Sequence, residues 1–386
     1  MENELLYQER LNRVMAAAEC AQPDRVPVIS FMENYAIGYA GATLAQCTEN
    51  PQFEIETMAK VHQDVYFDAA FISMITHPIR VDNILGNDDY FTADDGITLQ
   101  HKEFCPMTAE ELTVFAEDPY AYLYNVHFVR KFPNLRGTAE ERKKVIAASL
   151  GEVLAYAKKS EDSTAYFKEK LGMPMCTMGL SIAPADWFFD YFRGFSETMY
   201  DIRRHADAFK IAVKAAIQLS ATFSGLGMPQ LPRFPWTLTP LHMPTFLSIK
   251  QFEEFYWPTY KEYLLNVHAR GGHVAAVLEG EWDRFMPFFE ELPDKLFIMQ
   301  LENSDAVAAK KRLGGKACVG AGFPVSLLRD GTKQQCIDAA KYLIDECAPG
   351  GGFFISTSKQ LISPNDVKIE NYRAVNEFIH DYGVYH

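Results

Sequence analysis

The chain has 386 residues, of which 48% are hydrophobic and 23% are charged. These values are typical of a globular protein and exclude a disordered one. The net charge of −14 argues against a nucleic-acid binding protein, which is usually basic, but leaves room for a local basic pocket. Aromatic residues make up 13% of the chain; we expect them to fill the core and in part to line a pocket for a flat ligand.

The sequence shows no sign of export or of a membrane span. The first twenty residues mix glutamate and arginine and lack the continuous apolar run of a secretory signal. No run of about 18 apolar residues occurs anywhere. The seven cysteines form no CxxC pair, which favours reduced thiols over a disulfide scaffold. We therefore expect a cytoplasmic protein that contacts neither membrane nor nucleic acid.

Strands and helices alternate in the first half of the chain. Helical spacing predicts a helix over 5–20, and RVPVISF (25–31) reads as a buried strand. A helix over 51–64 and a strand over 67–74 follow. Mixed polar and aromatic residues over 78–136 predict an insertion with short strands and helix. Thr138 and Glu141 predict a capping box for a helix over 139–159, with a second helical piece to Lys170. A third strand follows over 173–180.

The alternation becomes steadier in the second half. Helices over 185–193 and 196–224 lead to a weak fourth strand at 228–233. A long helix begins near Ser248 and ends at Gly271–Gly272. Four further strands are predicted over 273–280, 295–302, 316–322 and 351–357, each followed by a helix.

Eight strands, most of them followed by a helix, predict one α/β unit spanning residues 1–386. The strands are apolar without alternation, as in parallel sheets covered on both faces. We therefore expect a single (β/α)8 TIM barrel with an N-terminal helix and an insertion after strand two. A doubly wound open sheet is the alternative. No GxGxxG follows the first strand, so no nucleotide cofactor is expected.

In a barrel the chemistry sits at the carboxyl ends of the strands. Glu279, in the segment LEGEWDRF, and His242, in the proline-flanked segment TPLHMPTF, are the candidate catalytic pair. Either acts as an acid, a base or a metal ligand. The plainer interpretations are that Glu279 caps a helix or pairs with Arg284, and that His242 is a surface histidine. The other strand ends supply the candidate substrate-binding residues Phe31, Glu33, Asn34, Tyr35, His77, Trp236 and Asn303.

Metal and phosphate motifs are missing from the sequence. No HxH, HExxH or closely spaced His–Cys–Cys set occurs, so a zinc site requires assembly from distant positions. The glycine runs at 320–322 and 350–352 lack the lysine of a phosphate-binding loop. Zinc held by His242 and Glu279 is the metal site that the sequence leaves open.

Several segments together resemble the uroporphyrinogen decarboxylase superfamily. They are ERLNRVMAAAECAQPDRVPVISFM near the start, FDAAFIS (67–73), SIKQFEEFYWPTYK (248–261), VLEGEWDRF (277–285), GAGFPVSLLRDGTKQQC (320–336) and GGGFFISTS with KIENYRAV (368–375). The resemblance covers most of the chain apart from the insertion. It implies the TIM barrel and one of two chemistries, uroporphyrinogen decarboxylation or cobamide-dependent methyl transfer.

The site residues that the resemblance implies favour the methyltransferase branch. True decarboxylases carry arginines after strand one, where this chain has FMENYAIGY (31–39), and an aspartate after strand two, where it has ISMITH (72–77). Arg80, Arg193 and Arg233 would have to converge to replace the missing charge. The thiol-activating methyltransferases carry His-x-Cys on strand five, where this chain has Val277 and Glu279.

The resemblance therefore implies a corrinoid-dependent methyltransferase that takes a methyl group from a small donor, such as a methoxylated aromatic. Glu279 and His242 would assist the leaving oxygen, and Phe31, Tyr35 and Trp236 would cover a flat substrate. The corrinoid would be carried by a partner protein, and a homodimer is plausible from the resemblance. The alternatives are uroporphyrinogen decarboxylation in heme biosynthesis and a barrel that binds a tetrapyrrole without turnover.

Overall fold

The computed structural model describes residues 2–225 and 227–385 and shows an α/β protein built on parallel strands. Six strands form one parallel sheet in the order β10-β9-β8-β7-β6-β5, and two short strands, β1 and β2, pair with each other in parallel. The parallel strands are β1 (Ile29–Ser30), β2 (Ala69–Ala70), β5 (Thr177–Leu180), β6 (Trp236–Leu241), β7 (Val274–Leu278), β8 (Phe297–Leu301), β9 (Cys318–Phe323) and β10 (Phe353–Thr357).

Single parallel bridges connect the two sheets at both edges. Val28, just before β1, pairs with Ile355 in β10. Ala70 in β2 pairs with Met175, just before β5. A core cluster draws side chains from all eight strands or from residues directly beside them, and α1 (Glu2–Ala18) adds Val14, Ala17 and Ala18 to it. Strands β7, β8 and β10 are buried along their whole length, as in parallel sheets that helices cover on the outer side.

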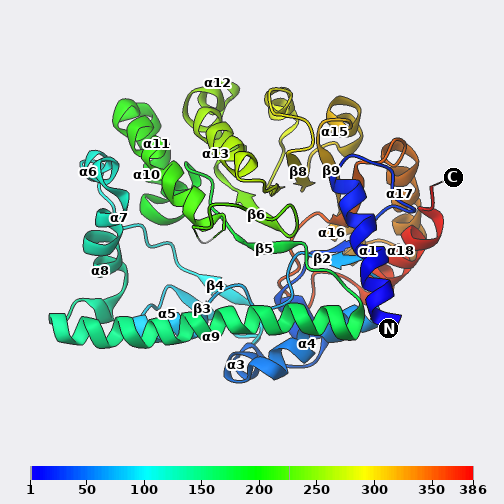
Figure 1. Cartoon of the computed structure of the whole chain (residues 1–386), viewed down its shortest axis with the longest axis horizontal. Coiled ribbons are helices and arrows are strands. Elements are labelled where there is room, and N and C mark those ends of the chain that lie inside the picture. The colour runs from blue at the N-terminus through cyan, green and yellow to red at the C-terminus, as the bar shows by residue number, and fades with distance from the viewer. Residues whose placement is uncertain (1, 226, 386) are drawn as a thin grey trace.

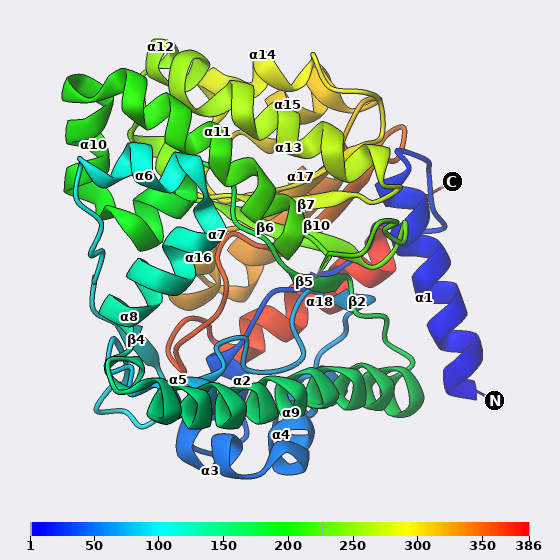
Figure 2. The ribbon, with the colours of Figure 1, turned by 60° about the vertical axis from the view of Figure 1, so that its left-hand side comes forward.

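Helices follow most strands and lie outside them. Figure 1 shows α10, α11, α13, α15 and α17 along one side of the strands and α9 along the opposite border, and Figure 2 shows the strands between these layers. The helices that follow the parallel strands are α2 (Asn34–Tyr39), α3 (Leu44–Glu49), α4 (Pro51–Asp64), α10 (Gly194–Arg204), α11 (Ala206–Phe223), α12 (Ile249–Gln251), α13 (Trp257–Ala269), α14 (Met286–Phe289), α15 (Ala306–Leu313), α16 (Val325–Asp330), α17 (Lys333–Cys347) and α18 (Ile369–Tyr382).

The predicted insertion holds a hairpin and several short helices before one long helix. Its elements are α5 (Ile79–Leu85), β3 (Tyr90–Thr92), β4 (Leu99–His101), α6 (Glu111–Glu117), α7 (Pro119–Tyr122) and α8 (Phe128–Lys131), and α9 (Ala139–Leu171) follows it. Helix α9 starts with the predicted capping box of Thr138 and Glu141 and ends at Gly172, whose φ of 57° suits glycine.

Two predicted boundaries are wrong. The fourth strand is at 236–241 and not at 228–233; it contains Pro240, a residue that argues against a central strand on sequence grounds. The two helical pieces expected over 139–170 are one helix of 33 residues, because no glycine or proline interrupts the segment between them. In the described part of the chain, no helix is long and apolar enough to cross a membrane.

Candidate functional site

Two carboxylates enclose His242 at the carboxyl ends of β6 and β7. Its Nδ1 lies 2.9 Å from an Asp190 oxygen, and its Nε2 lies 3.2 Å from Glu279 Oε1. His242 directly follows β6 and Glu279 directly follows β7, and the register pairs Leu241 with Leu278. The parallel register therefore brings the two predicted residues to the same level. Asp190 comes from η3 (Trp187–Phe192), the turn after β5.

The carboxylates decide the charge of His242. Burial alone would lower the pKa of the imidazole, but Asp190 and Glu279 together raise it from 6.5 to about 11. The ring is therefore an imidazolium at neutral pH. The side chain of His242 is 32% exposed and that of Glu279 is 46% exposed, so this charged pair is open to solvent and to a ligand.

Asp186 holds the backbone next to the pair. It is fully buried, one helical turn before Asp190, and it accepts hydrogen bonds from the Met243 N–H at 2.9 Å and the Tyr256 hydroxyl at 2.7 Å. Burial, and then the nearby charge of Asp190, raises the pKa of Asp186 to about 7. Asp186 thus fixes η4 (Met243–Phe246), the turn that follows His242.

A second polar group lies at the end of β8. Glu302 accepts a hydrogen bond from the Gly280 N–H at 2.6 Å and pairs with Lys359, at the end of β10, at 2.9 Å. The predicted residue Asn303 is exposed, and its amide donates to Glu302 at 3.2 Å. Glu302 therefore connects the segment after β7, which carries Glu279, to the ends of β8 and β10.

Glu33 is at the end of β1 and buried. Its carboxylate accepts hydrogen bonds from the Thr76 N–H at 2.7 Å, the Thr76 hydroxyl at 3.1 Å and the Gln360 amide at 2.5 Å. Burial raises the pKa of this carboxyl. The neighbouring Asn34 donates to the carbonyl of Ile97 at 2.5 Å, which ties the β3–β4 hairpin to the end of β1.

The three aromatic residues predicted to cover the substrate are buried. Phe31 packs edge-on against Phe71 inside the strands, and Trp236 is the first residue of β6, in the same core cluster. Tyr35 is also buried and stacks near Tyr39. The expected position of Trp236 after strand four is wrong because that strand begins at Trp236. Exposed aromatic side chains occur instead at Phe195 and Phe246, which pack with Phe189 next to Asp190.

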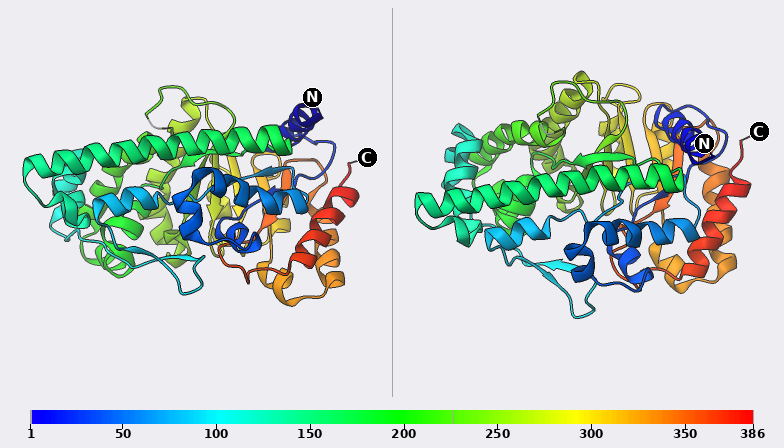
Figure 3. Two further views of the ribbon diagram at one scale, coloured as in Figure 1. Left: turned by 90° about the horizontal axis from the view of Figure 1, so that it is seen from below. Right: turned by 60° about the horizontal axis from the view of Figure 1, so that its bottom comes forward.

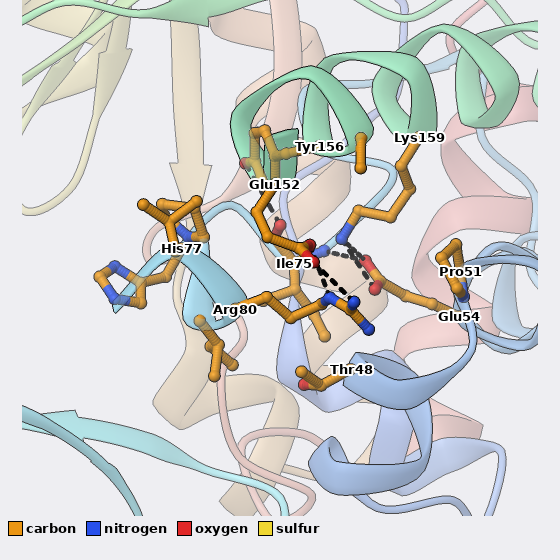
Figure 4. A pocket seen from close by; sticks show the side chains of 13 residues that line it. Thr48, Pro51, Glu54, Ile75, His77, Arg80, Glu152, Tyr156 and Lys159 are labelled. Atoms are coloured by element: carbon orange, nitrogen blue, oxygen red, sulfur yellow. Dashed lines mark hydrogen bonds and ion pairs between the residues drawn. The ribbon is translucent and has the colours of Figure 1, made fainter. Parts of the chain in front are cut away.

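His77 borders a cavity outside the strands, between α4, α5 and α9. Its Nε2 lies 2.7 Å from Asp82, and its ring stacks on Tyr90 with centroids 3.6 Å apart. In Figure 4 the ring points away from the ion pairs of the cavity. The cavity measures about 260 Å³ and is lined by Thr48, Pro51, Glu54, Ile75, His77, Pro78, Ile79, Arg80, Val81, Glu152, Ala155, Tyr156 and Lys159.

The three arginines that a polyanionic substrate would need are held elsewhere. Arg80 makes two hydrogen bonds of 2.7 Å to Glu152 in this cavity. Arg193 is buried against Asp201 at 2.6 Å, and Arg233 pairs with Glu19 at the end of α1. Their partners are not the two carboxylates that contact His242, so the three arginines do not converge there.

The ligand set for a metal is short. His242 Nε2 and Glu279 lie next to each other and offer two possible metal ligands. Asp190 contacts the other ring nitrogen, as a carboxylate that orients a metal-binding histidine does. Across residues 2–225 and 227–385, no group of three or more His, Cys, Asp or Glu side chains is placed to hold a metal. Catalytic zinc usually takes three protein ligands.

Sequence reasoning missed Asp186 and Asp190. The segment ADWFFDYF places two aspartates four residues apart, on one face of the helical turn after the third strand. A carboxylate pair in that position of a barrel is a signal that was present in the sequence.

Comparison with known proteins bears on the fold. No protein-family profile matches the chain, and no curated protein matches it either. Among solved structures, it is similar to a methyltransferase from Methanosarcina mazei, with a TM-score of 0.62, 14% identity, and coverage of 96% of this chain and 98% of that one. At this identity the likeness shows a shared fold over nearly the whole length.

Proposed function

We propose that this protein is a methyltransferase that moves a methyl group from a small donor, such as a methoxylated aromatic, to a corrinoid carried by a partner protein. The observation that carries the proposal is the Asp190–His242–Glu279 arrangement, a solvent-accessible imidazolium between two carboxylates. The resemblance of the sequence to the cobamide-dependent methyltransferases supports it. So does the fold shared with a methyltransferase from Methanosarcina mazei.

In this proposal His242 is the proton donor. When the bond between the methyl carbon and the ether oxygen breaks, its electron pair stays on the oxygen, which then takes the Nε2 proton of His242 and leaves as a phenol. Asp190 holds the ring through Nδ1 and keeps it charged. Glu279, beside Nε2, is the group through which His242 regains a proton from solvent. The corrinoid, when its carrier is docked, supplies the methyl acceptor.

The proposed site fits an acceptor that comes from outside the chain. Nearly half of the Glu279 side chain and about a third of the His242 side chain are accessible. Phe195 and Phe246 expose apolar surface beside them, which suits a flat donor or the face of a partner. Zinc fits less well because, among the described residues, no third His, Cys, Asp or Glu is placed to complete a metal site with His242 and Glu279, and we assign no step to it.

We also infer that the eight parallel strands close into a (β/α)8 barrel. The two bridges at the sheet edges and the core cluster with side chains from or beside every parallel strand support closure, because a packed interior is a property of such barrels. Closure would place Glu33, His242, Glu279 and Glu302 around one opening.

The charge around the strand ends counts against the decarboxylase alternative. A tetrapyrrole with many carboxylates needs arginine or lysine partners. Arg80, Arg193 and Arg233 are each paired with a carboxylate other than the two at His242, whereas the proposed site itself contains Asp190 and Glu279.

The proposal is tested by incubating the purified protein with cob(I)alamin and a series of methoxybenzenes. We expect the absorbance of methylcobalamin to rise together with release of the phenol. His242→Gln should lower the rate about 100-fold or more, as the loss of a general acid does. Glu281→Gln, which removes an exposed carboxylate that pairs with Arg284, is the matched control and should keep the rate.

Three results would contradict the proposal. One is the absence of methyl transfer from every donor, and another is the formation of coproporphyrinogen from uroporphyrinogen. The third is tight binding of donor or cobalamin without turnover, which would favour the binding-only alternative.

A further inference from the structure

Helix α9 is the longest element of the protein and is weakly buried. Its 33 residues span about 50 Å at 1.5 Å per residue, and it crosses the front of the molecule in both views of Figure 3. Only three of its side chains, Ser149, Ser163 and Phe167, are buried. Most of the helix surface therefore faces solvent in a single chain.

Over residues 146–163 the two faces of α9 have the reverse of the usual polarity, whereas Phe167 near its end is buried in the core. Its inward face carries Glu152, Tyr156, Lys159 and Ser163, which bind Arg80, the Thr76 carbonyl, Glu54 and Ser73. The apolar side chains point outward instead: Ile146 is 57% exposed, Leu150 57%, Val153 46% and Leu154 63%. A surface helix normally buries its apolar stripe, so this face is built to be covered.

The spacing of the outward face is that of a helix pair. The exposed residues follow alternating steps of four and three, the a and d positions of a heptad: Lys143, Ala147, Leu150, Leu154, Ala157 and Glu161. Leucines occupy the centre, small residues flank them, and opposite charges stand at the two ends. The face is therefore complementary to itself when one copy is reversed.

We propose that two copies of this chain associate through α9, paired antiparallel across a twofold axis near residue 152. This register places Leu150 opposite Leu154 of the partner subunit, Ala147 opposite the partner's Ala157, and Lys143 opposite the partner's Glu161. A parallel pair would instead bring Lys143 against Lys143 of the partner subunit, so the charges select the antiparallel arrangement.

The proposed interface is modest in size. The paired stretch from Lys143 to Glu161 is about 27 Å long. A helix pair of this length is at the small end of stable protein interfaces. We therefore expect a concentration-dependent monomer–dimer equilibrium in the micromolar range, independent of whether the proposed methyl transfer is correct.

Sedimentation velocity of the full chain over a micromolar concentration series tests the proposal. The mass should rise from 43.8 kDa to twice that value. Leu150→Lys combined with Leu154→Lys should keep the protein monomeric at every concentration. Ile211→Lys is the matched control, since Ile211 is 56% exposed on α11, and should leave the dimer intact.

A charge-reversal cycle tests the register and avoids the leucines. Lys143→Glu and Glu161→Lys should each weaken association about tenfold, and the double variant should restore it. These side chains are exposed, so thermal melting should be unchanged. The proposal is overturned if the wild type stays monomeric or if the Leu150→Lys and Leu154→Lys variant still dimerises. It is also overturned if the Lys143→Glu and Glu161→Lys double variant still associates weakly.

Discussion

Replacing Glu279 by glutamine should lower the pKa of His242 measurably. Glu279 Oε1 lies 3.2 Å from Nε2, and two unit charges at that distance attract by about 5 kcal/mol at an effective dielectric constant of about 20 and by about 1.3 kcal/mol in water. Because the Glu279 side chain is 46% exposed, screening favours the lower part of this range. At about 1.4 kcal/mol per pKa unit, the pKa should fall from about 11 to between about 9 and 10.

Asp190→Asn should lower the pKa of His242 further than Glu279→Gln. The side chain of Asp190 is 17% exposed and lies 2.9 Å from the ring, so solvent screens it less. NMR titration of the labelled imidazoles measures both effects, and His242→Gln identifies the resonance by its loss. Glu281→Gln is the control and should leave the pKa unchanged. A wild-type pKa near 6.5, or equal effects of the Glu279 and Glu281 variants, would refute the reasoning.

Three further predictions concern stability and are checked by urea denaturation. The pKa of His242 is raised in the folded state, so its protonation adds to the free energy of unfolding fully below about pH 6.5, and this stabilisation is lost as pH rises through 11. His242→Gln should therefore lower the free energy of unfolding by about 1–3 kcal/mol at pH 7 and by less near pH 11. Arg193→Met should cost about 3–5 kcal/mol because it leaves a buried carboxylate unpaired, whereas Arg80→Gln, on a half-exposed pair, should cost at most about 1 kcal/mol. Glu33→Gln should cost about 1–3 kcal/mol because glutamine keeps one acceptor oxygen, so its NH2 would face either the donors of Thr76 or the Gln360 amide. These accounts would be contradicted if the two arginine variants lost the same unfolding free energy or if the loss in His242→Gln did not change with pH. An unchanged urea midpoint for Glu33→Gln would also contradict them.

The sequence predicted the fold best where an apolar run has clear helix and turn signals on both sides of it. The apolar run of β7 between a capped helix and a turn marks a buried parallel strand, and the structure has it at Val274–Leu278. The fourth strand was misplaced because WTLTPL contains Pro240, which weakens the signal of a central strand. That error also moved Trp236 from the strand interior to the expected opening.

The predicted strand ends also explain which residues of the candidate site were predicted and which were missed. Counting strand ends paired His242 with Glu279 because neighbouring parallel strands end at one level. It missed Asp190 because that residue lies on a turn of helix whose direction depends on tertiary packing. Phe31 and Trp236 face the interior through the alternation of side chains along a strand; a correct strand register was needed to show this.

The most direct test of the central claim varies the leaving group. Methyl transfer to cob(I)alamin is measured for methoxybenzenes whose phenols span a wide range of pKa, with the wild type and with His242→Gln. If His242 protonates the departing oxygen, the wild-type rate should depend weakly on phenol pKa. The variant should lose most activity with the most basic phenolates and little with nitro-substituted ones. An equal loss for all donors, or no transfer to cobalamin from any of them, would contradict the account.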